Sequence, residues 1–260
     1  MPKKTKASVI PLGVSGALVD AQHENSYLAV EQEGRYWLVD CGGNVMGRLQ
    51  RVGLDPLSLQ GLIITHFHPD HVYGLPAFLL GLYVMGMQIT TPRQQPLPIY
   101  ARPQVLERVI ALLELFEYQG WLKALPLSYR EIVPQAGVKV AQDLSFEITA
   151  TPTHHSIPSM AVRFTSLQRK SAFVYSSDTL PCFEVEELAR GATLLFHEGE
   201  GAIHGHSTPA DAGALATRAG VERLAIIHYP VKKGAQVLLG AQSTFAGPVE
   251  LAEEFKRYYF

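Results

Sequence analysis

Leu-Ile-Ile-Thr-His-Phe-His-Pro-Asp-His, residues 62–71, places three histidines and one aspartate within six positions, directly after an apolar run. Neutral imidazole nitrogens and carboxylate oxygens are ligands that suit a borderline cation such as Zn²⁺. Pro69 favours an extended backbone before it and a turn after it, so the four side chains can diverge toward two adjacent ions. The stretch therefore predicts a buried strand that delivers metal ligands. A solvated, histidine-rich loop is the plainer alternative.

The length and composition of the chain are those of a globular protein. At 260 residues it suits one large domain or two small ones, and we expect residues 1–260 to form one domain because α/β folds often fill that length. Hydrophobic residues make up 47% of the chain, which is enough for a substantial core. A net charge of −2 argues against a protein that grips nucleic acid through bulk basicity, although a local basic patch is compatible with it.

The cysteines and the apolar segments bear on where the protein works. Cys41 and Cys182 form no Cys-x-x-Cys pair, which argues against a disulfide framework and against a thiolate zinc site. A cytoplasmic setting is therefore expected. The apolar segment behind the N-terminal lysines is interrupted by Pro11 and two glycines, so it is a poor signal peptide. No apolar run reaches membrane-spanning length, and we expect no association with a membrane.

Five apolar segments typical of strands each end in histidine, aspartate or glutamate. Ligands and catalytic groups of α/β folds gather at the carboxyl ends of strands, where side chains leave the sheet. One polar strand end would mean little, but five of them indicate one shared site. The strands are expected over residues 62–65, 146–151, 172–175, 193–196 and 224–227, and the polar ends are the first histidine cluster, His154-His155, Asp178, His197-Glu198 and His228.

The remaining patterns predict the scaffold around this site. Residues 13–16 contain two glycines and are expected to form a plain turn, although such a turn could also present N–H groups to an anion. Further strands are expected over residues 8–12, 26–30, 35–39, 97–100 and 138–140. Helices are expected over residues 45–52, 72–84, 103–116 and 181–190.

Thr208-Pro209-Ala210-Asp211 is a capping box with proline at the first helical position, and Gly220 is expected to end this helix. His206 and Ser207 therefore lie at a helix N-terminus. The partial positive charge there suits a phosphate or an oxyanion.

Short motifs rich in histidine, glycine and acidic residues cover most of the chain. Besides residues 65–71 they are Asp40-Cys41-Gly42-Gly43, Gly74-Leu75-Pro76, His155-Ser156-Ile157-Pro158, Tyr175-Ser176-Ser177-Asp178-Thr179, His197-Glu198, Gly205-His206-Ser207-Thr208 and Ile227-His228. Together they resemble the metallo-β-lactamase superfamily and, within it, the ribonuclease Z-like phosphodiesterases. The resemblance implies an α/β fold of the αβ/βα sandwich type, in which two mixed β-sheets pack face to face, helices cover the outer faces and metals bind at one edge.

The resemblance also implies the metal ligands. One ion is expected on His66, His68 and His155, and the other on Asp70, His71 and His228, with Asp178 as the bridge between them. His154 is expected to lie outside this ligand set. The implied cofactors are two Zn²⁺ ions, with Mn²⁺ or iron as alternatives.

This arrangement implies hydrolysis assisted by two metals. Two cations about 3.5–4 Å apart can turn a bridging water into hydroxide near neutral pH and neutralise the charge that grows on a phosphoryl oxygen. Asp70 belongs to the catalytic set, and Asp40 is a candidate partner for a ligating imidazole. The resemblance makes His206 the acid that protonates the leaving group and Glu198 the residue that orients it and keeps it charged. A surface histidine beside a helix cap is the plainer interpretation of His206.

One departure from the family bears on the substrate. Ribonuclease Z proteins that process tRNA usually carry a long flexible arm between the third histidine motif and the bridging aspartate. Only residues 156–177 separate His155 from Asp178 here, which leaves no room for that arm. We therefore expect a phosphodiesterase, ribonuclease Z-like in its endonuclease chemistry, whose substrate is a small phosphodiester or a short RNA end. The family likeness also implies a homodimer.

Three other functions are compatible with parts of the pattern. A thioester, lactone or β-lactam hydrolase would use the same metals but has no clear need for His206 as an acid. A catalytically inactive scaffold is disfavoured because every ligand motif is intact. A di-iron redox protein is disfavoured because His68 occupies a place where that branch typically has a carboxylate, and because no flavin domain follows.

Overall fold

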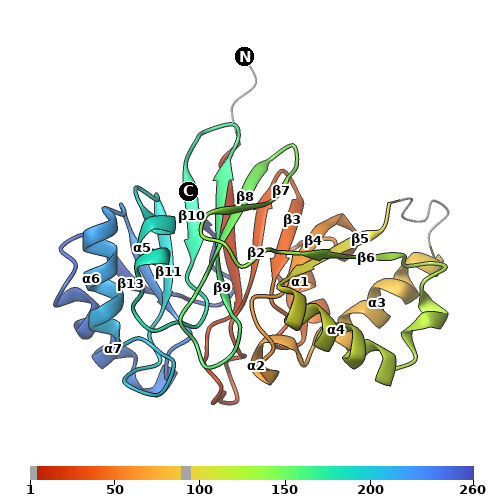
Figure 1. The fold of residues 1–260 in the computed structure, drawn as a ribbon, viewed down its shortest axis with the longest axis horizontal. Coiled ribbons are helices and arrows are strands. Elements are labelled where there is room, and N and C mark those ends of the chain that lie inside the picture. The colour runs from red at the N-terminus through yellow and green to blue at the C-terminus, as the bar shows by residue number, and fades with distance from the viewer. Residues whose placement is uncertain (1–4, 89–94) are drawn as a thin grey trace.

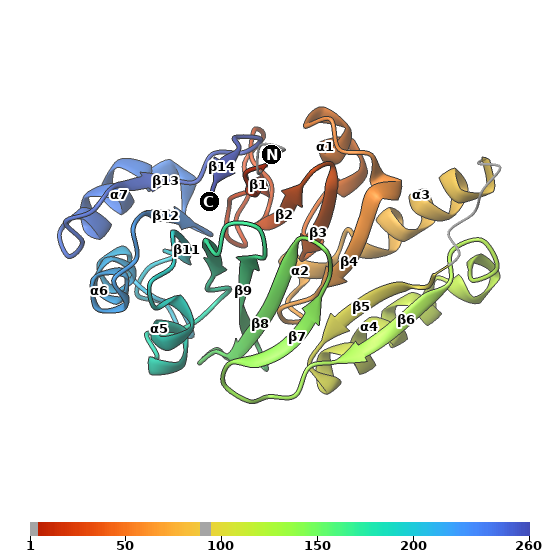
Figure 2. The same ribbon diagram turned by 90° about the horizontal axis from the view of Figure 1, so that it is seen from above.

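The computed structural model describes residues 5–88 and 95–260, which form two seven-stranded β-sheets (Figure 1). The sheets pack face to face, and helices cover the outer side of each (Figure 2). This arrangement confirms the expected αβ/βα sandwich. No helix in the described ranges is both long and apolar enough to cross a bilayer.

The first sheet is antiparallel from β14 to β3 and parallel from β3 to β6. Its strands lie in the order β14 (Tyr258–Tyr259), β1 (Ser8–Gly13), β2 (Tyr27–Gln32), β3 (Arg35–Val39), β4 (Leu59–Ile63), β5 (Leu97–Ala101) and β6 (Leu127–Glu131). The helical segments of this half are α1 (Val45–Arg51), η1 (Pro56–Ser58), α2 (Pro69–Val72), α3 (Leu75–Gln88), α4 (Pro103–Leu115) and η2 (Tyr118–Trp121).

The second sheet is parallel from β13 to β10 and antiparallel from β10 to β7. Its strands lie in the order β13 (Val249–Leu251), β12 (Leu224–Ile227), β11 (Leu194–Glu198), β10 (Ala172–Tyr175), β9 (Met160–Ser166), β8 (Phe146–Pro152) and β7 (Val138–Gln142). The helical segments of this half are α5 (Phe183–Ala189), α6 (Pro209–Ala219), η3 (Val231–Lys233) and α7 (Gly234–Gln242).

Alternation along the strands divides the buried side chains into two layers, because neighbouring residues of a strand point to opposite faces. Val9 of β1 packs between the sheets, where it joins Phe164 and Phe173 of the second sheet. The next residue, Ile10, faces the other way and packs with Leu79 of α3. The first sheet is thus buried on both faces, which makes it a rigid support for the loops at its edge.

Most predicted elements are present, many with bounds that differ by one or two residues, and three of the differences bear on the site. The strand expected over residues 62–65 is β4, Leu59–Ile63, so the histidine motif begins in the loop behind it. The helix expected over residues 72–84 is instead two helices, α2 and α3, because the Gly74 N–H donates to the Cys41 carbonyl oxygen. β11 extends to Glu198, so His197 and Glu198 lie within the strand.

The turn at residues 13–16 is a structural one. The N–H groups of Val14 and Ser15 both donate to the carbonyl oxygen of Glu24, at 3.0 and 2.9 Å. These two amides are therefore already satisfied, which agrees with the plain-turn interpretation.

Candidate metal centre

The histidine motif adopts the local structure that Pro69 predicts. His68 precedes α2 with an extended backbone (φ −77°, ψ 149°), and Pro69 is the first residue of that one-turn helix. Asp70 and His71 follow within the turn. Their side chains therefore point differently from those of His66 and His68, which lie in the extended segment after β4.

The structure brings side chains from both sheets to one edge of the sandwich. The first sheet supplies the histidine motif after β4, and the second supplies His155 after β8, Asp178 after β10 and His228 after β12. Three residues that follow strands have left-handed backbones, namely Asp40 after β3 (φ 64°), Ser177 after β10 (φ 52°) and His228 after β12 (φ 50°). Such a conformation is uncommon outside glycine and often marks functional sites.

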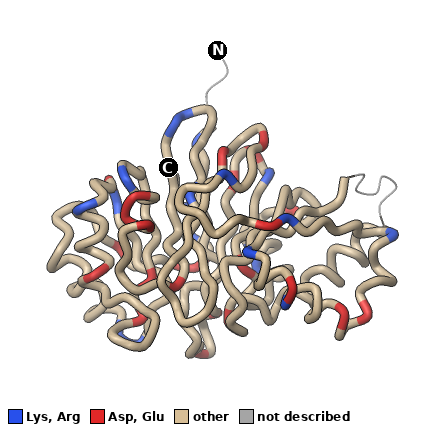
Figure 3. The backbone as a smooth tube through the Cα atoms, viewed as in Figure 1, with Lys and Arg blue, Asp and Glu red and all other residues tan. Residues whose placement is uncertain are grey.

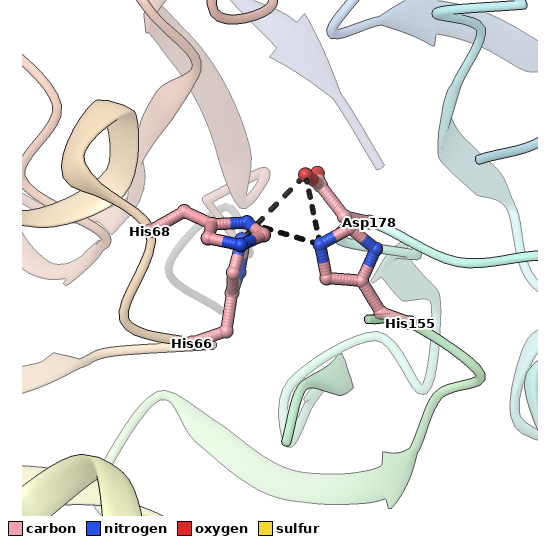
Figure 4. A group of neighbouring side chains, drawn as sticks. All are labelled: His66, His68, His155 and Asp178. Carbon is pink, nitrogen blue, oxygen red and sulfur yellow. Dashed lines mark hydrogen bonds and ion pairs between the residues drawn. The ribbon is translucent and has the colours of Figure 1, made fainter. Parts of the chain in front are cut away.

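The first group consists of His66, His68, His155 and Asp178, each of which offers one ligand atom within 4.8 Å of the others (Figure 4). His155 Nε2 lies 3.1 Å from His68 Nδ1. Asp178 Oδ2 lies 3.5 Å from His66 Nε2 and 3.9 Å from His155 Nε2. The ligand atoms thus surround a small volume from several sides.

The second group consists of Asp70, His71 and His228. Asp70 Oδ2 lies 3.6 Å from His71 Nε2 and 3.4 Å from His228 Nε2. Asp178 Oδ2 approaches the same two nitrogens, at 3.6 and 3.4 Å. Asp178 therefore lies between the two groups, in the position of a bridge.

Several ligand atoms in these groups are buried without a hydrogen-bond partner among the described residues. They are His66 Nε2, His71 Nε2 and Asp178 Oδ1. Buried polar atoms in native proteins are nearly always paired, so a convergent set of unpaired ones needs an explanation. Bound cations would supply it, because imidazole and carboxylate are suitable ligands. The residues present therefore fit a dinuclear metal site.

The opposite nitrogen of most of these imidazoles is held by the protein. His71 Nδ1 donates to Asp40 Oδ2 at 2.9 Å, and Asp40 also accepts from the N–H and hydroxyl of Thr65 at 2.8 Å each. His155 Nδ1 donates to the Gly205 carbonyl oxygen at 2.8 Å. Such bonds fix the tautomer and aim Nε2 into the centre. The structure thus shows the Asp40 contact that was expected.

Electrostatics separate the two groups. Burial and the neighbouring imidazoles hold the pKa of His66 well below its ordinary value of 6.5 and also lower that of His68, which keeps both neutral as metal ligands must be. Burial also opposes charge on His71, but Asp178 and Asp40 outweigh it and raise the pKa of His71 to about 10. The carboxylates around His71 thus favour a positive charge at this position, which a bound cation would supply in place of the proton, because a metal-ligating imidazole is neutral.

Glu198 organises the other side of the centre. Its Oε1 accepts from His206 Nδ1 at 3.0 Å and from the N–H groups of Thr179 and Ser207 at 3.1 and 3.0 Å, and its Oε2 accepts from the Glu200 N–H at 3.0 Å. His206 is thereby held beside the two groups of candidate ligands. A nitrogen of its ring lies within 4.8 Å of ligand atoms of Asp178 and His228.

An open pocket of about 310 Å³ gives access to this edge. It is lined by ligand-group residues together with Ala17, Glu200, Ile203 and His206. His154 points elsewhere, since its side chain is 60% exposed and lies 3.6 Å from Glu184. His197 is buried, and its Nδ1 donates to the Glu198 carbonyl oxygen.

Sequence reasoning missed two contributors to the site. Gly205 supplies the carbonyl for His155, and its backbone (φ 84°) favours glycine; a Cβ atom there would lie 2.9 Å from His155 Nδ1. Glu200 lies 3.4 Å from His228 Nδ1. Gly205 stands in the Gly205-His206-Ser207-Thr208 motif, which was quoted without a role for the glycine, and Glu200 follows the His197-Glu198 motif by two positions.

Two mixed sheets with paired histidine and aspartate groups at one edge define a metal-dependent hydrolase of the metallo-β-lactamase type. Residues 35–229 match the family described as the Beta-lactamase superfamily domain. The chain therefore belongs to this superfamily.

The relatives narrow the likeness to the ribonuclease Z branch, as the motifs indicated. Ribonuclease Z of Methanothermobacter thermautotrophicus is 26% identical over 94% of this chain and 93% of that protein. Two solved structures share the fold. The metallo-β-lactamase fold protein YhfI from Bacillus subtilis has a TM-score of 0.83 at 22% identity and covers 98% of this chain and 100% of its own. The short form of human tRNase Z has a TM-score of 0.78 at 23% identity and covers 96% and 98%.

Proposed function

We propose that the protein is a single-domain, zinc-dependent phosphodiesterase of the ribonuclease Z type, which cleaves small phosphodiesters or RNA ends. The observation that carries this proposal is the Glu198–His206 pair, 3.0 Å apart, beside two groups of metal-ligating side chains. Phosphodiester cleavage needs a proton for the leaving alkoxide, and this pair can supply it. Hydrolysis of a thioester has no comparable need, because a thiolate leaves without being protonated.

Seven side chains would hold two divalent cations, and Zn²⁺ suits their imidazole and carboxylate atoms. When bound, the cations supply a reactive water near neutral pH and neutralise charge on a phosphoryl oxygen. Mn²⁺ and iron are the alternatives to zinc. The proposed ligands are His66, His68 and His155 for one ion, Asp70, His71 and His228 for the other, and Asp178 between them.

His206 would act as the general acid. Its Nδ1 is bound to Glu198, so Nε2 is the nitrogen left to face a substrate in the pocket that His206 lines. The carboxylate of Glu198 stabilises the imidazolium form, which keeps the donated proton available. After donation, the neutral imidazole keeps its orientation through the same hydrogen bond.

The loop between β9 and β10 supports a small substrate. It is a tight turn in which the Lys170 N–H donates to the Ser166 carbonyl oxygen at 2.8 Å, and residues 156–177 contain no long arm. Lysine and arginine are scattered among acidic residues along the backbone (Figure 3). Both features favour a short phosphodiester over a large folded RNA.

The test is a comparison of substrates combined with metal analysis. We expect zinc-loaded protein to hydrolyse bis(p-nitrophenyl) phosphate and short RNA faster than precursor tRNA, a thioester or a β-lactam. The His206→Ala variant should lose most of its activity on short RNA, whose alkoxide leaving group needs a proton, and less on bis(p-nitrophenyl) phosphate, whose p-nitrophenolate leaves without one. Preferential hydrolysis of the thioester or lactam, with His206→Ala unimpaired, would overturn the proposal.

The setting and assembly follow from the family likeness and the cysteines. The ribonuclease Z resemblance supports a homodimer, which light scattering coupled to gel filtration would test. Cys41 and Cys182 are both buried and free, which supports a reducing cytoplasm.

A further inference from the structure

Each imidazole of the second ligand group has a carboxylate beside Nδ1, the ring nitrogen that does not face the candidate metal site. For His71 this is Asp40, at 2.9 Å from Nδ1. For His228 it is Glu200, whose Oε2 lies 3.4 Å from Nδ1. Glu200 Oε2 and His228 Nδ1 are both buried, and neither has a hydrogen-bond partner in the described part of the chain, so the ion pair is the contact each of them makes. The two residues are therefore matched by position and by charge.

His228 needs such a partner more than the other ligands do. Its backbone is left-handed (φ 50°), a conformation that costs a residue other than glycine roughly 1–3 kcal/mol and persists only when the surroundings hold it. Its Nε2 must at the same time face Asp70 and Asp178, both 3.4 Å away. A carboxylate at Nδ1 fixes the ring in that direction.

A glycine in the β1–β2 turn leaves space for the Glu200 carboxylate. A Cβ atom at Gly16 would lie 1.9 Å from Glu200 Oε2, so only glycine leaves the space that Glu200 occupies. The turn that contains Gly16 is tied to the same region, because Ser15 forms a β-bridge with Tyr229, the residue after His228. The Glu200 N–H is fixed in turn by Glu198 Oε2 at 3.0 Å.

We propose that Glu200 is a positioning residue of the metal centre, which holds His228 through its Nδ1 atom, and that Gly16 is the residue that admits it. This inference rests on the proposed function, since it concerns the ion that Asp70, His71 and His228 would bind. Loss of a residue that orients a metal ligand typically weakens metal binding 10- to 100-fold. Glu200 touches a ligand and not the substrate, so metal affinity is the direct readout.

The experiment uses the full chain, stripped of metal and titrated with ZnCl₂ against a chromophoric chelator. We expect wild type to bind two Zn²⁺ ions. Glu200→Ala should weaken the affinity for one of the two ions by about 10- to 100-fold and leave the affinity for the other unchanged. Glu200→Gln should lose less zinc affinity, because its amide oxygen can still accept a hydrogen bond from His228 Nδ1. Glu107→Gln, an exposed substitution on α4, is the matched control and should bind zinc as wild type does.

Gly16→Ala provides an independent test of the same contact. The atom that an added Cβ would strike is the far end of a flexible side chain, so the substitution should displace the carboxylate without unfolding the protein. Gly16→Ala should therefore weaken binding of the same ion as Glu200→Ala does. The double variant Gly16→Ala/Glu200→Ala should bind zinc no more weakly than Glu200→Ala alone, because the two changes act through one contact.

The outcomes separate this inference from the proposed function. Two tightly bound ions in Glu200→Ala, with wild-type affinities, would overturn the positioning role and leave the phosphodiesterase proposal intact. Additive losses in the double variant would overturn the link between Gly16 and Glu200. A wild-type protein that binds no divalent cation would overturn both proposals.

Discussion

At the scale of single residues, the side chains proposed to hold metal are distinct from the one proposed to donate a proton. His68 lies 3.1 Å from His155 within the first ligand group, whereas His206 is bonded to Glu198 at the rim of the pocket. We expect His68→Ala to abolish hydrolysis with loss of metal. His206→Ala should lower kcat about 10²- to 10⁴-fold with metal retained. Turnover of a short RNA, whose alkoxide leaving group needs the proton, and metal content per chain measure both effects. Equal metal loss in the two variants would contradict the acid role.

The pH dependence of turnover should report the same pair. Burial lowers the pKa of His206, but the hydrogen bond and negative charge of Glu198 outweigh it and hold this pKa above its ordinary value of 6.5. An acid works only while protonated, so kcat should fall as pH rises through that pKa. In Glu198→Gln the charge is lost, and the alkaline limb should move to lower pH.

The control for this shift is His154→Gln, which changes an exposed histidine outside the ligand groups. Its pH profile should match that of the wild type. An alkaline limb that stays in place in Glu198→Gln would mean that His206 is not the acid observed.

At the scale of elements, the start of α6 links stability to the site. Thr208 caps this helix by accepting from the Asp211 N–H, and the Asp211 carboxylate accepts from the Thr208 N–H in return. Thr208→Ala should lower the free energy of unfolding by about 1 kcal/mol, measured in urea on metal-free protein. Gln104→Ala, an exposed change in the first turn of α4, should have an effect within about 0.5 kcal/mol. An equal loss in both variants would contradict a specific capping effect.

The elements that could be predicted are those with a local signal. The bounds of α6 could be predicted from the capping box at Thr208 and from Gly220 at its end, and β12 could be predicted from its apolar run. The break between α2 and α3 could not be predicted, because it depends on a hydrogen bond from Gly74 to Cys41, far back in the chain. β9 was missed although its buried residues alternate, and β13 and β14 are too short to carry a pattern.

The residues of the site also divide into those with a local sequence signal and those that depend on distant contacts. The proposed ligands were predictable because each stands in a motif at a strand end. The contacts that hold them were harder to foresee. Asp40 reaches His71 across 31 positions, and Glu200 reaches His228 only because the β1–β2 turn leaves space at Gly16. Such pairs depend on sheet register and on loop packing, which periodicity does not encode.

At the scale of the whole molecule, the metal centre joins the two halves of the sandwich. The first sheet contributes the histidine motif after β4, and the second contributes His155, Asp178 and His228. Cations bound between these groups would bind the folded state and not the unfolded one, and would therefore stabilise it by mass action. With free metal at about a thousand times Kd, this linkage amounts to about 4 kcal/mol per site.

Metal removal should therefore lower the midpoint of thermal unfolding by about 10 °C for each ion lost. We expect EDTA to lower it and added ZnCl₂ to restore it, as followed by calorimetry. His68→Ala should respond less, because one ligand group is incomplete, whereas Glu107→Gln should respond as wild type does. If zinc binds in two equivalents yet leaves the midpoint unchanged, the ions do not join the sheets, and the unpaired atoms of His66 and His71 must be satisfied in some other way.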